Sequence, residues 1–388
     1  MTVFQNFCNI HKTNIASIAI AASFALGETA HAKTTITLDD NLAISFLSGQ
    51  LDTRRYQGEI FDVELFEDGA LVAIADRVLL KSEGSFEDPD LVIRQFEVDN
   101  LEAVDDSLFL TAQTIRVRDL HLGWLADDAP STTVNPLDWQ QASYQMENIE
   151  IIDENAGYAL AIPRFATMPF EFDQLSDGTA FLASGGFEMP YMQILPFGDS
   201  AGAIEFETWL DSAGLSYLEF AFLAQQQNSI QGADIISDSV MQMRMAGLFD
   251  LLIRTEFYTS EDAFFLLSDP DMWRDEAEAY LSYLAAETKL GSFKINMRDL
   301  GLLAFIDQTG ELPPYPILAE QMKGIMGSFL PETGPELARA IEGFMIEGGA
   351  LQLSATPNTP FRIEDFAAAL FMPDFVVRQI SLNAIHTP

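Results

Sequence analysis

The sequence predicts a β-dominated α+β fold, in which repeated hairpins build a long, mostly antiparallel sheet and helices pack on the C-terminal half. Apolar and polar residues alternate with a period of two through much of 33–201, and short acidic turns separate the alternating stretches. Beyond residue 202 the strand pattern continues, and stretches with helical periodicity join it. Alternation bounded by Asp, Asn and Gly is typical of hairpins, whereas a period near 3.6 indicates amphipathic helices.

The chain begins with the features of a cleavable signal peptide. Lys12 gives a weakly basic start, residues 14–26 are small or apolar without a charge, and Ala30-His31-Ala32 places small residues where signal peptidase cleaves. The apolar run is shorter than the roughly 20 residues that span a bilayer. We therefore expect residues 1–32 to be removed near Ala32, and the mature chain to be periplasmic or secreted without a transmembrane segment. Cys8 lies inside the signal peptide, so a lipid-modified cysteine at the cleavage site is not expected.

The mature chain is long enough for two regions, a β-hairpin repeat region at 33–201 and an α+β region at 202–388 that can continue the same sheet. It contains no cysteine and therefore forms no disulfide. The full sequence has 59 acidic and 20 basic residues, a net charge of −39. This charge repels nucleic acid, so no nucleic-acid partner is expected. Adaptation to salt and binding of cations or basic partners both remain compatible with the acidity.

Three stretches in the N-terminal region share one pattern, an apolar strand, an acidic turn and a second alternating strand. They cover residues 63–78, 98–115 and 146–165. Asp68-Gly69 is the strongest turn signal, because glycine readily adopts the positive φ of tight hairpins. The spacing of the stretches is irregular, with a loop at 127–131, which favours stacked hairpins in a long sheet over a propeller with fixed blades.

The C-terminal region alternates strands and helices. Ser260 precedes two acidic residues and can cap the chain that leads to a helical face with Trp273 and Tyr280. Leu337 and Phe344 mark a second helix, which starts near Pro335 and ends at Gly348-Gly349. Strands are predicted at 204–210, 215–223, 240–245, 251–258, 292–298, 350–355 and 378–384, with a short helix at 364–370.

Few residues could support conventional catalysis. The mature chain keeps two histidines, His121 at a strand end and His386 close to the C-terminus. Two histidines without cysteine exclude a conventional structural zinc site, and the sequence has no G-x-S-x-G elbow, P-loop or dinucleotide-binding glycine motif. We expect a protein that is not an enzyme and binds no cofactor, with no catalytic, cofactor-binding or metal-ligating residue assigned.

Carboxylates are too abundant for a pair of them to identify a site. Asp105-Asp106 or Asp127-Asp128 could serve acid–base hydrolysis, which we keep as an alternative. Asp269 and Asp271 could ligate calcium, although capping of the next helix explains them equally well.

Five arginines stand in predicted strands, flanked by apolar residues: Arg94, Arg116, Arg244, Arg298 and Arg378. Cross-strand salt bridges with the abundant carboxylates are the favoured interpretation, and contact with lipid phosphates or an anionic polymer is the alternative.

The hairpin repeats, the stretch from Phe293 to Leu302 and the ending from Gly349 to Leu382 resemble uncharacterised proteobacterial periplasmic envelope proteins of unknown function. More distantly, the N-terminal repeats resemble the β-hairpin repeats of AsmA-like envelope proteins, whose long curved sheet forms an apolar groove. The resemblance covers most of 60–385 and carries over no functional residue. It departs from the AsmA-like type because no membrane anchor is retained.

The resemblance implies an envelope factor without catalytic activity, which binds a lipid or another apolar ligand on a concave β surface or interacts with an envelope protein. Apolar strand faces such as Leu108-Leu110-Ala112 and Leu351-Leu353-Ala355 are candidates for that surface. The alternatives are a structural or interaction protein with a filled core and no ligand, and a carboxylate-based hydrolase.

Overall fold

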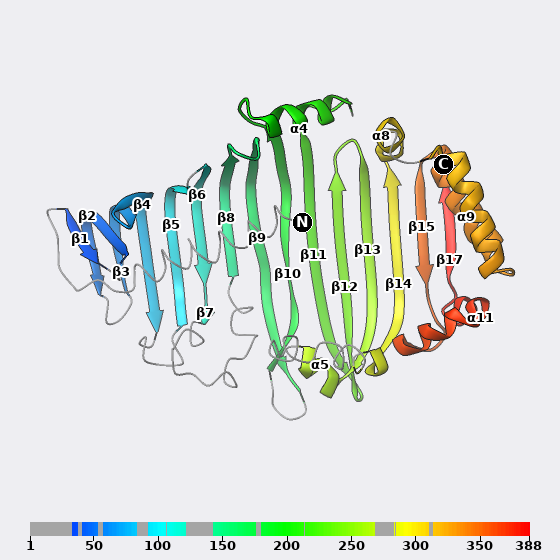
Figure 1. The fold of residues 1–388 in the computed structure, drawn as a ribbon. Coiled ribbons are helices and arrows are strands. Elements are labelled where there is room, and N and C mark those ends of the chain that lie inside the picture. Colours follow the sequence, from blue (N-terminus) through cyan, green and yellow to red (C-terminus); the bar gives the residue numbers. More distant parts are fainter. Residues whose placement is uncertain are drawn as a thin grey trace. The chain divides into compact units, whose positions relative to one another are not determined.

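The computed structural model describes residues 33–37, 41–52, 57–83, 92–105, 107–121, 143–175, 180–212, 214–267, 283, 285–309 and 313–388. The predicted signal peptide, the loop at 127–131, the helical face around Trp273 and the acidic residues Asp269 and Asp271 lie outside these residues. The described residues confirm the predicted fold class. Most form long antiparallel strands, and the helices concentrate in the C-terminal half (Figure 1).

The chain divides into two compact units. Unit 1 comprises the residues up to Thr167 together with 194–206, and unit 2 comprises 168–193 and 207–388. The strands β9 (Tyr158–Gln174) and β10 (Ala180–Pro196) contribute residues to both units. The predicted boundary at 201/202 falls at the start of the helix α4 (Ala201–Ser212).

Unit 1 is a meander in which each strand pairs antiparallel with its neighbours. Its other strands are β1 (Thr34–Thr37), β2 (Leu42–Asp52), β3 (Gln57–Glu67), β4 (Ala70–Glu83), β5 (Val92–Asp105), β6 (Leu108–Arg118), β7 (Leu120–His121) and β8 (Ser143–Asp153). All three predicted hairpins are present, as β3–β4, β5–β6 and β8–β9. Asp68 and Gly69 have φ of 50° and 80°, which confirms the predicted turn.

One face of unit 1 is a fully buried apolar core. Each strand supplies alternate residues to it, among them Ile60 on β3, Leu80 on β4, Val98 on β5 and Ile115 on β6, all at most 2% exposed. Leu110 and Ala112 belong to the same buried set. The face that the sequence offered as an open surface in this region is therefore core.

Unit 2 continues with long antiparallel strands. After β10 they are β11 (Leu218–Gln231), β12 (Asp234–Met245), β13 (Phe249–Ser260), β14 (Thr288–Asp299), β15 (Ala350–Ala355), β16 (Phe361–Arg362) and β17 (Asn383–Thr387). β11 to β14 pair in chain order, β14 pairs with β15, and β15 pairs with β17.

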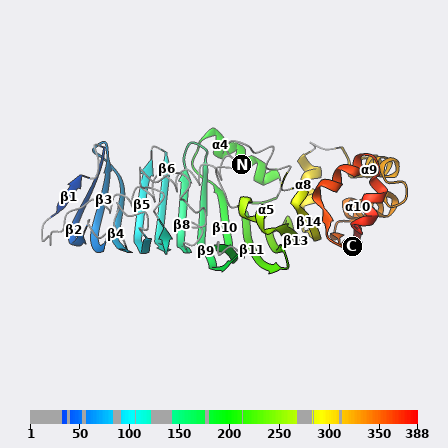
Figure 2. The same cartoon turned by 90° about the horizontal axis from the view of Figure 1, so that it is seen from below.

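The helices of unit 2 lie at the ends of its strands or pack on its last strands. They are α5 (Glu261–Leu267), α8 (Leu302–Thr309), α9 (Tyr315–Phe329), α10 (Gly334–Glu347), the 3-10 helix η3 (Ile363–Leu370) and α11 (Pro373–Gln379). Ser260 caps α5, because its Oγ accepts a hydrogen bond of 3.3 Å from the amide of Ala263. α10 packs on α9 and against β17 (Figure 2). No helix among the described residues is long and apolar enough to cross a membrane.

Two predicted strands are wrong. Residues 204–210 belong to α4, where Ala203 and Leu210 are the buried positions and Ser200 accepts a hydrogen bond from the amide of Ala203. Residues 378–384 contain the end of α11 and a turn at Ser381, whose φ is 50°, and β17 begins only at Asn383. The strand predicted at 215–223 begins three residues before β11, the other strands predicted after residue 202 lie in β12 to β15, and the predicted helices at 335–347 and 364–370 are α10 and η3.

Candidate functional site

One face of unit 2 carries two neighbouring rows of apolar side chains that cross the sheet from strand to strand. Residues that face each other in antiparallel register point to the same side, so the rows follow from the pairing. One row is Phe222, Met243, Leu251, Met297 and Leu351, and the next is Ala224, Met241, Ile253, Ile295 and Leu353. We call these ten residues the apolar band. Neither row contains a polar side chain.

The apolar band is half-buried along its whole length. None of its residues is fully buried, whereas Ile60 and Val98, on the apolar face of unit 1, are at most 1% exposed. The contrast matters because both units are built from the same alternating strands. A face that is core in unit 1 is therefore partly open to solvent in unit 2.

The composition of the apolar band suits a surface that adapts to its occupant. Met241, Met243 and Met297 lie close together, on β12 and β14. Methionine has three rotatable bonds and a polarisable sulfur, so it adjusts to irregular apolar shapes and is frequent at binding surfaces with broad specificity. The ring of Phe187 on β10 stacks on Phe222 and extends the apolar surface toward that strand.

Helices pack on the same face as the apolar band, at its borders. α5 places Phe264 against Ile235 and Phe181. η3 and α11 place Phe366 and Ile380 against Leu290, Ala355 and their neighbours at the ends of β14 and β15. At the last strand, Nε2 of His386 lies 2.8 Å from the carbonyl oxygen of Gly348, and the ring contacts Gly343 of α10. The apolar band lies between these borders.

Toward the α5 end of the strands, polar residues limit the apolar band on β11 to β13, whereas Phe293 and Ala355 continue the same row on β14 and β15. Gln226, Ser239 and Thr255 follow in the next row on β11 to β13, and Asn228 stands one row further. Asn228 is 5% exposed and donates a hydrogen bond of 2.7 Å to the carbonyl oxygen of Leu182. The opposite face of the same strands is polar, with Gln242, Arg254 and Lys294 among its residues. Unit 2 therefore has one apolar and one polar face, although neither is as fully covered as the core of unit 1.

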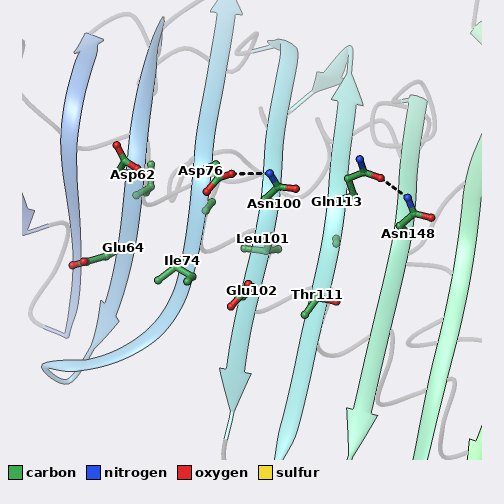
Figure 3. A pocket seen from close by; sticks show the side chains of 13 residues that line it. Asp62, Glu64, Ile74, Asp76, Asn100, Leu101, Glu102, Thr111, Gln113 and Asn148 are labelled. Carbon is green, nitrogen blue, oxygen red and sulfur yellow. Dashed lines mark hydrogen bonds between the residues drawn. The ribbon is translucent and has the colours of Figure 1, made fainter.

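Unit 1 offers a second candidate, a crease on its polar face (Figure 3). At one level of the sheet each strand carries an extra residue that leaves the regular pairing. The residues are Asp62 on β3, Asp76 on β4, Asn100 on β5, Gln113 on β6 and Asn148 on β8. They line a groove of about 630 Å³ together with outward-facing neighbours on the same strands.

On alternate strands, the backbone of the crease adopts a positive φ. Asp62, Asn100 and Asn148 have φ of 52°, 51° and 50°, a conformation that Asp and Asn tolerate better than other residues with a side chain. Asn100 donates a hydrogen bond of 2.7 Å to Asp76, and Asn148 donates one to Gln113. The extra residue lets two successive side chains point outward without shifting the buried faces on either side.

The chemistry of the crease is acidic and amide-rich. Asp62, Glu64, Asp76 and Glu102 supply carboxylates, and Lys33 pairs with Glu64 at 2.6 Å. Among the described residues, no three histidine, cysteine or acidic side chains converge in a way that could hold a metal ion. At the level of the crease the regular pairing of the strands from β3 to β8 is interrupted.

Arg77 lies directly beside the crease and joins three carboxylates. Its guanidinium is 2.6 Å from Glu59, 2.9 Å from Asp99 and 3.3 Å from Glu97. Hydrogen bonds to Asp99 and Glu59 raise the pKa of Arg77 further above its ordinary value. Burial alone would raise the pKa of Glu97, but hydrogen bonds from Gln95 and Arg77 lower it overall.

The predicted salt bridges are confirmed for three of the five arginines. Arg94 pairs with Glu83 and Asp119, Arg116 approaches Glu97 and Glu147, and Arg244 pairs with Asp250. Arg298, on β14, lies opposite Asp250 of β13. Arg378 stands in α11 and not in a strand, where it pairs with Glu332 at 2.5 Å.

Both histidines that the sequence analysis singled out lie in strands. His121 is the last residue of β7 and pairs with Val92, as expected for a strand end. His386 lies within β17, the last strand of the chain. Sequence reasoning named Leu351 and Leu353, which lie in the apolar band, but missed the other eight residues of the band and the crease. The apolar band as a whole can be recognised only from the pairing register of the strands. The crease is visible in the sequence as a recurring pattern, Asp62-Val63-Glu64, Asn100-Leu101-Glu102 and Asn148-Ile149-Glu150.

No protein-family model matches the chain, and the curated proteins contain no significant match to it.

Proposed function

We propose that the protein binds the acyl chain of a lipid, or an apolar molecule of similar size, on the apolar band of unit 2. In this proposal it acts in the cell envelope as a carrier or assembly factor without catalytic activity. One observation carries the proposal. Two adjacent rows without a polar side chain cross the sheet, half-buried, between helices that pack at their borders.

The dimensions of the apolar band support an elongated ligand. Neighbouring strands lie about 4.8 Å apart, so the rows from β11 to β15 extend over about 19 Å. This length is comparable with that of a long acyl chain. Two rows side by side provide a strip wide enough for one or two chains to lie across the strands.

Burial energetics support a ligand as well. Each methylene group that leaves water for an apolar surface contributes about 0.8 kcal/mol, so a long chain gains several kcal/mol from partial burial. Open apolar surface beyond a few hundred Å² is unusual in soluble proteins and commonly marks a binding site. The rows themselves contain no acid, base or nucleophile, so the proposal is binding without bond cleavage.

The envelope assignment rests on the signal-peptide features of residues 1–32 and on the net charge of −39, which disfavours nucleic acid.

One experiment distinguishes a lipid-binding protein from a structural protein without ligand. Solvent extraction of the purified protein, followed by mass spectrometry, should release a lipid or fatty acid in near-stoichiometric amount. Recovery of no apolar molecule, together with no binding of a fluorescent fatty acid, would support the ligand-free alternative.

A further inference from the structure

A second apolar surface lies beside the apolar band, on the outer side of η3 and α11. Phe371, Met372 and Phe375 are 86%, 55% and 52% exposed, and Phe329 at the end of α9 is 64% exposed. We call these four residues the docking patch. Phe371 lies in the turn between η3 and α11 and is the most exposed large apolar side chain among the described residues. Such a side chain projects into the surroundings and does not line a pocket.

The docking patch is held in place by a carboxylate. Asp374, in the first turn of α11, accepts hydrogen bonds from the amides of Glu332 and Thr333 and from the hydroxyl of Thr333. Arg378 pairs with Glu332 across the same contact. These bonds fix the chain between α9 and α10 against α11, so the end of α9 and the start of α11 meet at one corner of unit 2.

The docking patch and the apolar band are connected through α11. On the inner side of this helix, Val376 and Ile380 are buried, and Ile380 packs with Leu290 and Ala355. Ala355 and the neighbouring Phe293 stand in the row directly next to Leu353 and Ile295 of the apolar band. Apolar side chains therefore continue from the apolar band, through the contacts of η3 and α11, to the exposed phenylalanines.

We propose that the docking patch inserts into the surface of a zwitterionic phospholipid bilayer, from which the apolar band receives its ligand. The choice of a bilayer over a protein partner rests on the function proposed above, because a lipid carrier must reach its ligand at a membrane. Exposed aromatic side chains favour the interfacial region of a bilayer. At the rim, Arg378 pairs with Glu332 and Asp374 adds a further negative charge, so the rim offers no net positive charge to an anionic surface. The net charge of −39 opposes binding to anionic lipids, which leaves a neutral surface.

Sedimentation with phosphatidylcholine vesicles tests the inference. The wild-type protein should sediment with the vesicles, and a double variant Phe371→Ser and Phe375→Ser should partition at least about tenfold more weakly, since two buried aromatic side chains are lost. A control double variant, Leu71→Ser and Ile204→Ser, removes two apolar side chains that are 52% and 57% exposed from unit 1 and should bind as the wild type does. Addition of phosphatidylglycerol to the vesicles should weaken binding.

A second measurement does not depend on the serine variants folding. The mature protein with Phe371→Cys as its one cysteine, labelled with an environment-sensitive fluorophore, should show a blue-shifted and stronger emission on addition of phosphatidylcholine vesicles. No shift, no sedimentation of the wild-type protein, or equal sedimentation of the Phe371/Phe375 variant would overturn the inference. A wild-type dimer that this variant converts to a monomer would instead assign the docking patch to self-association.

The vesicle-free fatty-acid assay separates this inference from the proposed function. A protein that binds the fluorescent fatty acid but not vesicles would retain the proposed function and refute the docking patch. A protein that binds vesicles through Phe371 but no fatty acid would retain the docking patch and refute the apolar band.

Discussion

The ring of Phe222 on β11 stacks on the ring of Phe187 on β10, with centroids 5.2 Å apart and planes 19° apart. Phe222 is also the first residue of an apolar row that continues through Met243 and Leu251. Aromatic pairs of this geometry add stabilisation beyond simple burial. The pair therefore holds one end of the apolar band rigid, while methionines make its middle adaptable.

Replacement of Asn100 should separate the stability that its side-chain hydrogen bond contributes from the stability that its backbone conformation contributes. Asn100→Ala loses the hydrogen bond to Asp76 and places a less tolerant residue at a φ of 51°, so the free energy of unfolding should fall by about 2 kcal/mol. Asn100→Gly loses only the hydrogen bond and should cost about 1 kcal/mol, because glycine adopts positive φ without strain. Urea denaturation of both variants measures the difference. An alanine variant at least as stable as the glycine variant would show that the backbone conformation is not the constraint.

The carboxylate of Glu97 should contribute stability above pH 5 and lose it in acid. Its folded-state pKa is lowered by hydrogen bonds from Gln95 and Arg77, so the contribution is complete above the ordinary pKa near 4.5 and disappears as the pH falls through the folded value. Glu97→Gln should therefore cost about 1 kcal/mol near neutral pH, a modest value because Arg77 is partly exposed. The gap between variant and wild type in urea denaturation should close as the pH falls below the ordinary pKa of 4.5 and through the lowered folded-state pKa. A gap that does not change with acidification would exclude the ion pair as its cause.

The contact between Asp374 and the chain before α10 should be visible in amide exchange. Asp374→Ala removes the acceptor for the amides of Glu332 and Thr333, whose exchange should accelerate about tenfold while the amides of β12 keep their rates. Although burial alone would raise the pKa of Asp374, its hydrogen bonds to Thr333 and Glu332 lower it overall. Protection in the wild type should therefore persist as the pH falls through the ordinary pKa of an aspartate. Unchanged exchange in the variant would mean that other contacts hold this chain segment.

The sequence was sufficient for the hairpins because their signals are local. Asp68-Gly69 specifies a tight turn, and Pro335 with Gly348 marks the two ends of α10. The segment 204–210 was misread because its apolar residues alternate as a strand would, whereas packing selects the helical pair Ala203 and Leu210. The stacking of Trp209 on Phe305, with ring centroids 5.1 Å apart, links α4 to α8 and cannot be seen in a local pattern.

The apolar strand faces also show that a local sequence pattern does not specify tertiary packing. Leu108-Leu110-Ala112 and Leu351-Leu353-Ala355 have nearly the same pattern, yet Leu110 is 7% exposed while Leu351 and Leu353 are half-buried. Period-two alternation predicts that a strand has an apolar face, but it carries no information about what packs on that face. The crease was predictable in principle, because Asp62, Asn100 and Asn148 each add one polar residue that breaks the alternation.

Binding of a fluorescent fatty acid to a pair of single variants on β12 tests the central claim most directly. Met243 lies in the apolar band, and Gln242 is the adjacent residue on the opposite, polar face of the same strand. Met243→Glu should weaken binding by at least about a hundredfold, because a carboxylate in the centre of the band must lose water when the chain binds. Gln242→Glu introduces the same charge one residue away and should leave the affinity within about twofold. Equal affinity of the two variants, or no measurable binding by the wild-type protein, would contradict the account.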